Sequence, residues 1–293
     1  MYKDSFLNYL QYIKRYSDHT VKSYQIDLTQ FISFCQENNV MDEAKADYKL
    51  VRLWIVSLME SENSARSVNR KISTLRTYYK YLLKEKIVER SPLQKIIPPK
   101  SLKSLPSFIE EKSMNALLDN VSFTDDFEGV RNKLIIEMFY CTGARRFELI
   151  NLLVKNINFQ NSTIKVLGKR NKERIIPFNT ELKNLIELYN LKRNELEVIE
   201  NSEFLFLTKS GKKIYPELIY RVVKSYLSLV TTSEKKSPHV LRHTFATHML
   251  NRGAELNAIK ELLGHSNLAA TEVYTHNTFE KLKQIYKQAH PRA

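Results

Sequence analysis

Residue types that define several classes of protein are scarce in this sequence. It has 293 residues and only two cysteines, Cys35 and Cys141, both in apolar surroundings. Their spacing is not that of a metal-binding pair, so we expect reduced thiols in the core of an intracellular protein. No apolar run approaches the ~18 residues that span a bilayer, and the polar start at Met1 predicts no signal peptide. We therefore expect a cytoplasmic protein without a membrane partner.

Repeats and low-complexity tracts are also absent. Hydrophobic residues make up 43% and charged residues 27% of the chain, which is typical of a globular protein with a substantial core. This composition excludes the disordered and fibrous classes. The length suits two domains of ordinary size.

Acidic residues are outnumbered by basic ones. The 46 Lys and Arg against 32 Asp and Glu give a net charge of +14. Such an excess attracts polyanions, so the sequence favours nucleic acid as a partner over a merely solvated surface. The imbalance is +7 up to Pro106 (18 basic, 11 acidic) and +7 after it (28 basic, 21 acidic). Both parts are therefore expected to contact the same polyanion.

The first ninety residues predict helices. Apolar residues recur at helical spacing in Thr20–Gln36, in Leu50–Met59 and in Ser64–Lys84. Basic residues are interleaved along the third segment. This pattern is typical either of a solvated helix face or of a helix laid against a DNA groove.

A proline-rich segment divides the chain. Four prolines fall within the sixteen residues that end at Pro106, which predicts a stiff, extended and basic linker. We expect a helical domain over 1–90, a linker over 91–106 and a second domain over 107–293. Two basic modules joined in this way can close around a duplex.

The second domain combines helices with a few strands. Helices are expected at Glu110–Leu118 and Val130–Cys141, and again from Tyr215 to the end. Strands are expected at Thr163–Val166, Arg174–Pro177 and Phe204–Leu207, the first two joined by a turn. The predicted fold class is mainly α, with a small antiparallel three-stranded sheet in a mostly helical second domain.

Cationic side chains recur in this domain. Arg145 and Glu148 are three residues apart on one helix face, so the carboxylate can orient the guanidinium, although a surface ion pair has the same spacing. His239 and Arg242 lie within one turn of a helix that begins at Pro238.

His239 and His243 also have the spacing of zinc ligands. However, Val240 takes the place of the glutamate in H-E-x-x-H, and no acidic third ligand follows nearby. We expect neither a metal nor a cofactor.

A nucleophile and a proton donor complete the pattern. Lysine is common in turns for solubility, but an ammonium at Lys169 can protonate a departing alkoxide if it is held over a phosphate. Tyr274 lies nine residues after His265. Because a phenol attacks phosphorus only when cations stabilise the developing charge, the arginines and histidines suggest phosphoryl transfer without a metal.

Five sequence elements occur in one order between Thr142 and His276. They are T-G-x-R-x-x-E-L, G-K-x-N-K-E-R, H-x-L-R-H-T-F-A-T-H, L-L-G-H and V-Y-T-H. On these motifs the chain resembles the tyrosine recombinase (phage integrase) family over nearly its full length, and the Xer-type site-specific recombinases in particular. The resemblance implies a helical, SAM-like core-binding domain ahead of a catalytic domain.

The resemblance also implies a role for each residue. Tyr274 would form a 3′-phosphotyrosyl link and Lys169 would protonate the leaving 5′-oxygen. The remaining predicted site residues would hold the phosphate, assist proton transfer or support the site: Arg145, Arg242, His239, His265 and Glu148. DNA contacts are expected from basic residues of the first domain: Lys22, Arg66, Arg70 and Arg76.

The implied partners are a recombination site in double-stranded DNA and further recombinase protomers in a homo- or hetero-tetramer. The tail after Asn277 is expected to dock on a neighbouring protomer, with packing on its own domain as the alternative. A DNA translocase is a further candidate partner, as activator. The task (dimer resolution in chromosome partition, mobile-element integration or inversion) stays open. A type IB topoisomerase and a non-catalytic DNA-binding regulator are less favoured alternatives.

Two residues depart from the family pattern. Phe147 stands where a small residue is usual, which predicts altered packing beside Arg145. Arg170 replaces the usual turn glycine, so a left-handed turn residue is expected at Asn171 instead.

Overall fold

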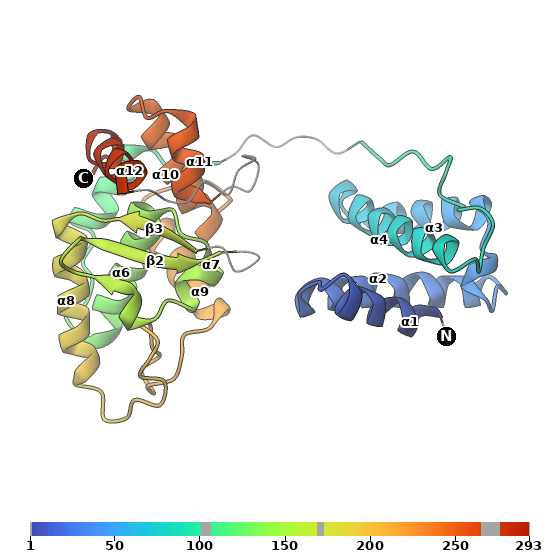
Figure 1. Ribbon diagram of the computed structural model, residues 1–293, viewed down its shortest axis with the longest axis horizontal. Helices are drawn as coiled ribbons and strands as arrows, with labels where there is room; N and C mark the ends of the chain where they lie inside the picture. The colour runs from blue at the N-terminus through green and yellow to red at the C-terminus, as the bar shows by residue number, and fades with distance from the viewer. Residues whose placement is uncertain (1, 101–106, 169–172, 265–275, 293) are drawn as a thin grey trace. The chain divides into compact units, whose positions relative to one another are not determined.

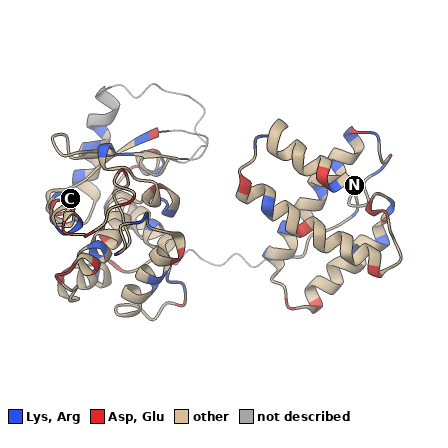
Figure 2. Cartoon of the chain, turned by 90° about the horizontal axis from the view of Figure 1, so that it is seen from below, with Lys and Arg blue, Asp and Glu red and all other residues tan. Residues whose placement is uncertain are grey.

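The computed structural model describes residues 2–100, 107–168, 173–264 and 276–292, the last range with side chains from 281 on. The chain forms two compact units, Met1–Ser104 and Leu105–Ala293 (Figure 1). Lys and Arg are distributed over both units (Figure 2). None of the helices in these ranges is long and apolar enough to cross a membrane.

The first unit is a bundle of helices. Its elements are α1 (Tyr2–Asn8), the π-helical turn η1 (Tyr9–Ile13), α2 (Asp18–Glu37), the 3-10 turn η2 (Glu43–Lys45), α3 (Tyr48–Glu60) and α4 (Ala65–Lys84). The predicted segments Thr20–Gln36 and Leu50–Met59 lie within α2 and α3. The apolar face predicted for the third helix is confirmed, because Val68, Ile72, Leu75, Tyr79 and Leu82 are all 1% exposed or less.

A helix before Thr20 was not predicted individually. Helix α1 packs through Phe6, whose ring lies 5.1 Å from that of Tyr78 on α4, measured between centroids. Its segment is too short for a clear helical period, so tertiary packing rather than local pattern defines it.

The proline-rich segment is in part packed. Leu93 and Ile96 are buried in the core of the first unit. Arg76 donates to the carbonyl of Ile96 at 2.9 Å, and Asn69 donates to that of Pro99 at 3.0 Å. The portion up to Pro99 therefore lies along α4 instead of running free, because its apolar side chains find a place in the bundle.

The second unit surrounds one central helix. In chain order its elements are α5 (Glu111–Asn115), η3 (Ala116–Asn120), α6 (Phe127–Thr142), α7 (Arg146–Ile150), η4 (Val154–Asn156), β1 (Ile157–Asn158), β2 (Thr163–Leu167), β3 (Glu173–Pro177), α8 (Thr180–Asn194), α9 (Pro216–Ser228), α10 (Pro238–Asn251), α11 (Leu256–Leu263) and α12 (His276–Ala289). Helix α6 is buried along most of its length and packs against α8, α9 and α10.

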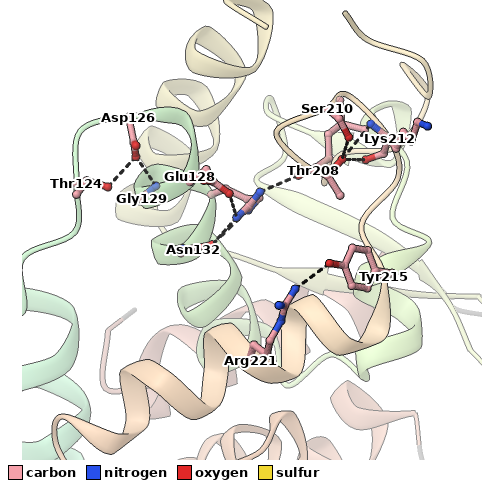
Figure 3. A network of polar contacts seen from close by, with 12 residues as sticks. Thr124, Asp126, Glu128, Gly129, Asn132, Thr208, Ser210, Lys212, Tyr215 and Arg221 are labelled. Atoms are coloured by element: carbon pink, nitrogen blue, oxygen red, sulfur yellow. Dashed lines mark hydrogen bonds and ion pairs between the residues drawn. The ribbon is translucent and has the colours of Figure 1, made fainter.

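The start of α6 is fixed by a cap and by an ion pair of the buried Arg131. Asp126 accepts hydrogen bonds from the Gly129 amide at 2.8 Å and the Thr124 hydroxyl at 2.7 Å (Figure 3). One turn on, Arg131 is 1% exposed and donates to Glu128 at 3.0 Å. These contacts lie at the start of α6, at the other end of the helix from Gly143.

The sheet has three antiparallel strands in the order β1-β2-β3, and Val166 pairs with Arg174. This agrees with the predicted class, but the third strand is Ile157–Asn158. The prediction of a strand at Phe204–Leu207 was wrong, because that segment makes only isolated bridges.

The segment Phe204–Leu207 is fully apolar, and its middle is buried on all sides. Much of its backbone pairs with side chains: Tyr189 donates to the Leu205 carbonyl and accepts from the Leu207 amide, each at 3.1 Å. Such a run looks like a buried strand in sequence, yet it needs no sheet when side chains satisfy the backbone.

The tail packs on its own domain. Helix α12 contacts α10, α11 and β3, and Leu282, Tyr286 and His290 are 4% exposed or less. His290 donates from Nε2 to the Tyr140 carbonyl at 3.1 Å, and burial lowers its pKa to about 4. Arg292 pairs with Asp119 at 2.8 Å. The single chain thus shows packing of the tail on its own domain, and docking on a neighbouring protomer stays a prediction.

Candidate active site

The turn between α6 and α7 places Arg145. Gly143 ends α6 with φ of 57°, and a Cβ there would lie 2.6 Å from a ring carbon of Phe245. Only glycine fits both the conformation and the space. Arg145 then stands at the N-cap of α7, with its side chain 26% exposed.

The carboxylate of Glu148 orients the guanidinium group of Arg145. This carboxylate accepts from the Arg145 amide at 2.7 Å and from Arg145 Nη1 at 2.7 Å. The expected contact between the two residues is present. Because Glu148 is almost fully buried, this pair is not the exposed ion pair that the spacing alone also allowed.

Arg242 extends from α10 to the turn that carries Arg145. That helix begins at Pro238, as the sequence predicted. Arg242 is 9% exposed and donates to two backbone carbonyls, that of Gly143 and that of Leu263, the second at 2.6 Å. The structure therefore brings Arg242 to the turn that carries Arg145, and the two guanidinium groups bind the neighbouring carbonyls of Leu263 and Gly264.

A third arginine was missed by sequence reasoning. Arg174, on β3, donates from Nη1 and Nη2 to the two oxygens of Glu148 at 2.6 and 2.7 Å. The G-K-x-N-K-E-R element ends at this residue, but an arginine on a short strand carried no further signal. We call Arg145, Arg174, Arg242 and Glu148 the arginine cluster.

Charges in the arginine cluster do not balance. Burial, then the charges of Arg145 and Arg174, lower the pKa of the Arg242 guanidinium to about 9, which leaves it protonated at neutral pH. Burial pushes the pKa of Glu148 upward, but hydrogen bonds and charge from Arg174 and then Arg145 hold it below its ordinary value. Three cations facing one carboxylate make a site that favours an anion.

His239 lies on the first turn of α10 and is exposed. Desolvation, followed by the charges of Arg146 and Arg242, lowers the pKa of its imidazole below the ordinary 6.5. The ring is therefore neutral at pH 7 and able to accept a proton.

This shift predicts a pH dependence. If neutral His239 accepts a proton, the single-turnover cleavage rate should be constant near pH 7 and fall as the pH drops through the lowered pKa. The His239→Gln variant, which cannot titrate, should be slower at pH 7 and lose this acidic limb. A wild-type rate with no acidic limb over the pH range in which the enzyme stays folded, or an unchanged limb in the variant, would contradict the assignment.

Three predicted site residues lie outside the described residues: Lys169, His265 and Tyr274. Arg170 and Asn171, with the expected turn, lie there too. In the chain, Lys169 directly follows Gly168 after β2, and His265 directly follows Gly264 after α11. Tyr274 precedes the start of α12 at His276 by two residues.

The other histidines of α10 have different surroundings. His248 is buried, with Nδ1 2.9 Å from the Tyr140 hydroxyl and Nε2 2.8 Å from the Ile109 carbonyl, which suits a structural role. His243 is exposed. Within the described ranges, no group of three metal-ligating side chains comes together.

Phe147 does not crowd the site. Its side chain is 68% exposed on α7, so the ring takes up little room in the interior beside Arg145.

The four residues of the first unit that were predicted to contact DNA differ in whether their side chains already bind other parts of the protein. Lys22 and Arg66 are exposed. Arg70 is half-exposed but bound to buried Asp27, which also accepts from Thr74 at 2.8 Å. Arg76 is tied to the Ile96 carbonyl. Arg70 and Arg76 thus have structural partners in addition to any DNA contact.

Comparison with known proteins identifies the class. The Phage integrase family pattern matches residues 107–281, and the pattern of the phage integrase N-terminal SAM-like domain matches residues 4–86. The chain belongs to the phage integrase family of tyrosine recombinases, and is accordingly an enzyme that cuts and rejoins DNA strands.

Within that family the chain is Xer-like. It is 39% identical to tyrosine recombinase XerC of Oceanobacillus iheyensis, covering 100% of this chain and 97% of that protein. Its identity to the XerC of Anoxybacillus flavithermus is 37%, covering 98% and 97%.

Solved structures share the fold. The XerH site-specific recombinase bound to palindromic difH substrate, a post-cleavage complex, aligns with a TM-score of 0.71 and 22% identity, covering 90% of this chain and 78% of that chain. The Tn1549 transposon integrase in complex with circular intermediate DNA aligns with a TM-score of 0.72 and 19% identity, covering 96% and 98%.

Proposed function

We propose that this protein is a site-specific recombinase in which Tyr274 attacks a DNA phosphate and forms a 3′-phosphotyrosyl intermediate. The observation that supports this most directly is the charge imbalance of the arginine cluster. Arg145 and Arg242 bind neighbouring carbonyls at the end of α11, and the cluster holds one carboxylate against three guanidinium groups. A phosphodiester supplies one further negative charge, and its oxygens match the geometry of guanidinium groups.

In the proposed step the Tyr274 oxygen forms a bond to phosphorus while the bond from phosphorus to the 5′-oxygen breaks. Neutral His239 accepts the phenol proton, and Lys169 donates a proton to the leaving 5′-oxygen. A free 5′-hydroxyl results. Because the phosphotyrosine retains the energy of the broken bond, a 5′-hydroxyl from a partner strand can reverse the step without ATP or a metal ion.

The phosphate is held by preorganised donors in this proposal. Arg145 and Arg242 stabilise charge on the non-bridging oxygens, His265 adds a hydrogen bond, and Glu148 fixes Arg145. Donors that are held in place before the reaction need no reorganisation when charge develops in the transition state.

A nicked suicide duplex tests this function. The recombination site is first located by mapping the cleavage positions that the enzyme leaves on genomic DNA. With EDTA present and ATP absent, the nicked duplex should trap a covalent protein–DNA adduct, and intact sites should give joined recombinant product.

Relaxation of supercoils without recombinant product would indicate a topoisomerase, and binding without an adduct would indicate a regulator. The mapped cleavage positions also distinguish an integrase from an invertase, because these two tasks differ only in where the recombination sites lie.

The first unit is proposed to hold DNA through the exposed face of α4. Arg66 and Arg70 are one turn apart there, and Lys22 on α2 is exposed as well. Unlike Arg70, Arg66 is exposed and has no ion pair to a buried carboxylate among the residues that the structure describes, which suits a contact to phosphate.

Arg66→Ala should weaken binding to all duplex sequences alike. Losing one phosphate contact is expected to lower the slope of log affinity against log salt by about 1. Fluorescence anisotropy at several salt concentrations measures this slope. Arg52→Ala, the same change on α3, is the matched control. An unchanged slope in Arg66→Ala, or an equal drop in both variants, would refute the phosphate contact.

Assembly and location complete the proposal. We place the reaction in a tetrameric synapse of identical or paired recombinases, acting on DNA in the cytoplasm, with a DNA translocase as candidate activator. For the tail to link protomers, it has to leave the position on its own domain in which Tyr286 and His290 are buried.

A further inference from the structure

Three arginines bind three consecutive carbonyl groups at the end of α11. Arg174 Nε donates to Leu262 at 2.8 Å, Arg242 Nη2 donates to Leu263 at 2.6 Å, and Arg145 Nη2 donates to Gly264 at 2.9 Å. The last carbonyls of a helix have no partner within the helix and carry partial negative charge. The end of α11 is therefore a common anchor for strand β3, helix α10 and the turn before α7.

Arg174 differs from the other two arginines in where its donors go. Nε binds α11, and both terminal nitrogens bind Glu148 in a forked arrangement. Its side chain is 4% exposed, against 26% for Arg145. Such a residue has little surface left for a substrate, so any contribution to the reaction has to pass through its neighbours.

Those neighbours are the groups that aim Arg145. Glu148 Oε1 accepts from both Arg174 Nη1 and Arg145 Nη1, at 2.6 and 2.7 Å. The Leu262 and Gly264 carbonyls, two residues apart, are held by the same pair of arginines. Arg174 thus directly fixes Glu148, which accepts from one Arg145 nitrogen, and it holds α11 two residues before Gly264, whose carbonyl accepts from the other.

We propose that Arg174 is a positioning residue for the strand-cleavage reaction, holding Glu148 and the end of α11 so that Arg145 meets the scissile phosphate in the correct orientation. The inference rests on the proposed function, in which Arg145 binds that phosphate. The competing explanation is a buried ion pair that only stabilises the domain.

Arg174→Lys separates the two explanations. Lysine keeps the positive charge beside Glu148, but one ammonium cannot hold both carboxylate oxygens and the Leu262 carbonyl with the same planar geometry. Single-turnover cleavage of the nicked duplex at saturating enzyme should fall about a hundredfold, since a misplaced group can have that effect. The affinity for the uncleaved duplex should change by no more than about twofold, because Arg174 is buried.

Arg131→Lys is the matched control. Arg131 is likewise a buried arginine paired with a glutamate, at 3.0 Å from Glu128, and it lies at the start of α6. This variant should lower thermal stability, while cleavage per folded molecule stays at the wild-type value. If both variants lose cleavage only in proportion to the folded fraction, Arg174 has a structural role and the proposal is wrong.

A double variant tests whether Arg174 acts through Arg145. In an Arg145→Lys background, adding Arg174→Lys should lower the remaining cleavage rate by less than about threefold, because the group that Arg174 positions is already gone. A full further hundredfold loss would overturn the proposal. Failure of the proposed function itself is distinguishable, since the wild-type enzyme would then form no covalent adduct at all.

Discussion

Tyr274→Phe is expected to abolish covalent capture of nicked DNA and to lower cleavage by at least about a thousandfold. The substitution removes one oxygen and keeps the ring, so folding and DNA affinity should stay near wild type. No other hydroxyl is expected to replace it, because the attacking atom has to be placed in line with the leaving oxygen. Denaturing gel electrophoresis of the nicked duplex measures the loss.

Tyr215→Phe provides the control for this change. Tyr215 is 41% exposed, and its hydroxyl accepts from Arg221 at 2.8 Å (Figure 3). Removing that oxygen should leave the adduct yield unchanged. Adduct formation by Tyr274→Phe at the wild-type rate would mean that another group is the nucleophile.

The second large effect is a slower cleavage rate, which we expect for Arg242→Lys. Arg242 holds the Gly143 and Leu263 carbonyls at once and is 9% exposed. A lysine ammonium cannot reproduce this planar fork while also binding a phosphate oxygen. Loss of one preorganised donor to the developing charge should slow single-turnover cleavage by about 10² to 10³-fold, with a much smaller change in DNA affinity.

The control for this prediction is on the same helix. Arg252 lies at the C-terminal end of α10 and pairs with Glu111 at the surface. Arg252→Lys should keep the cleavage rate within about twofold, because a surface ion pair contributes little. If Arg242→Lys cleaves as well as Arg252→Lys, Arg242 does not stabilise the transition state.

Much of the fold follows from local pattern. The apolar face of α4 and the position of α6 were both predictable, since each helix shows a clear apolar pattern over many residues. The Phe204–Leu207 segment shows the limit. Its apolar run fits a strand, but whether a strand forms depends on the distant Tyr189, which binds that backbone instead.

The active site was predictable where its contacts are local. Arg145 and Glu148 are three residues apart, so one helical turn brings them together. Arg174 could not be assigned a role in this way. Its contact with Glu148 spans 26 residues and its contact with Leu262 spans 88, so both depend on how β3 packs against α7 and α11.

The position of the tail was not decided by its sequence. Apolar residues at helical spacing in α12 suit packing on its own domain as well as on a neighbour. The contacts of His290 with Tyr140 and of Arg292 with Asp119 favour its own domain in the single chain. Neither contact is visible as a pattern, because each joins residues more than a hundred positions apart.

The measurement closest to the central claim is peptide mapping by mass spectrometry of the adduct trapped on a nicked duplex. A single modified peptide should appear, carrying DNA through a 3′-phosphate on Tyr274, in a reaction containing EDTA and no ATP. DNA attached to a different residue, or joined through a 5′-phosphate, would contradict the assignment of Tyr274 as the group that attacks the phosphate held by Arg145 and Arg242.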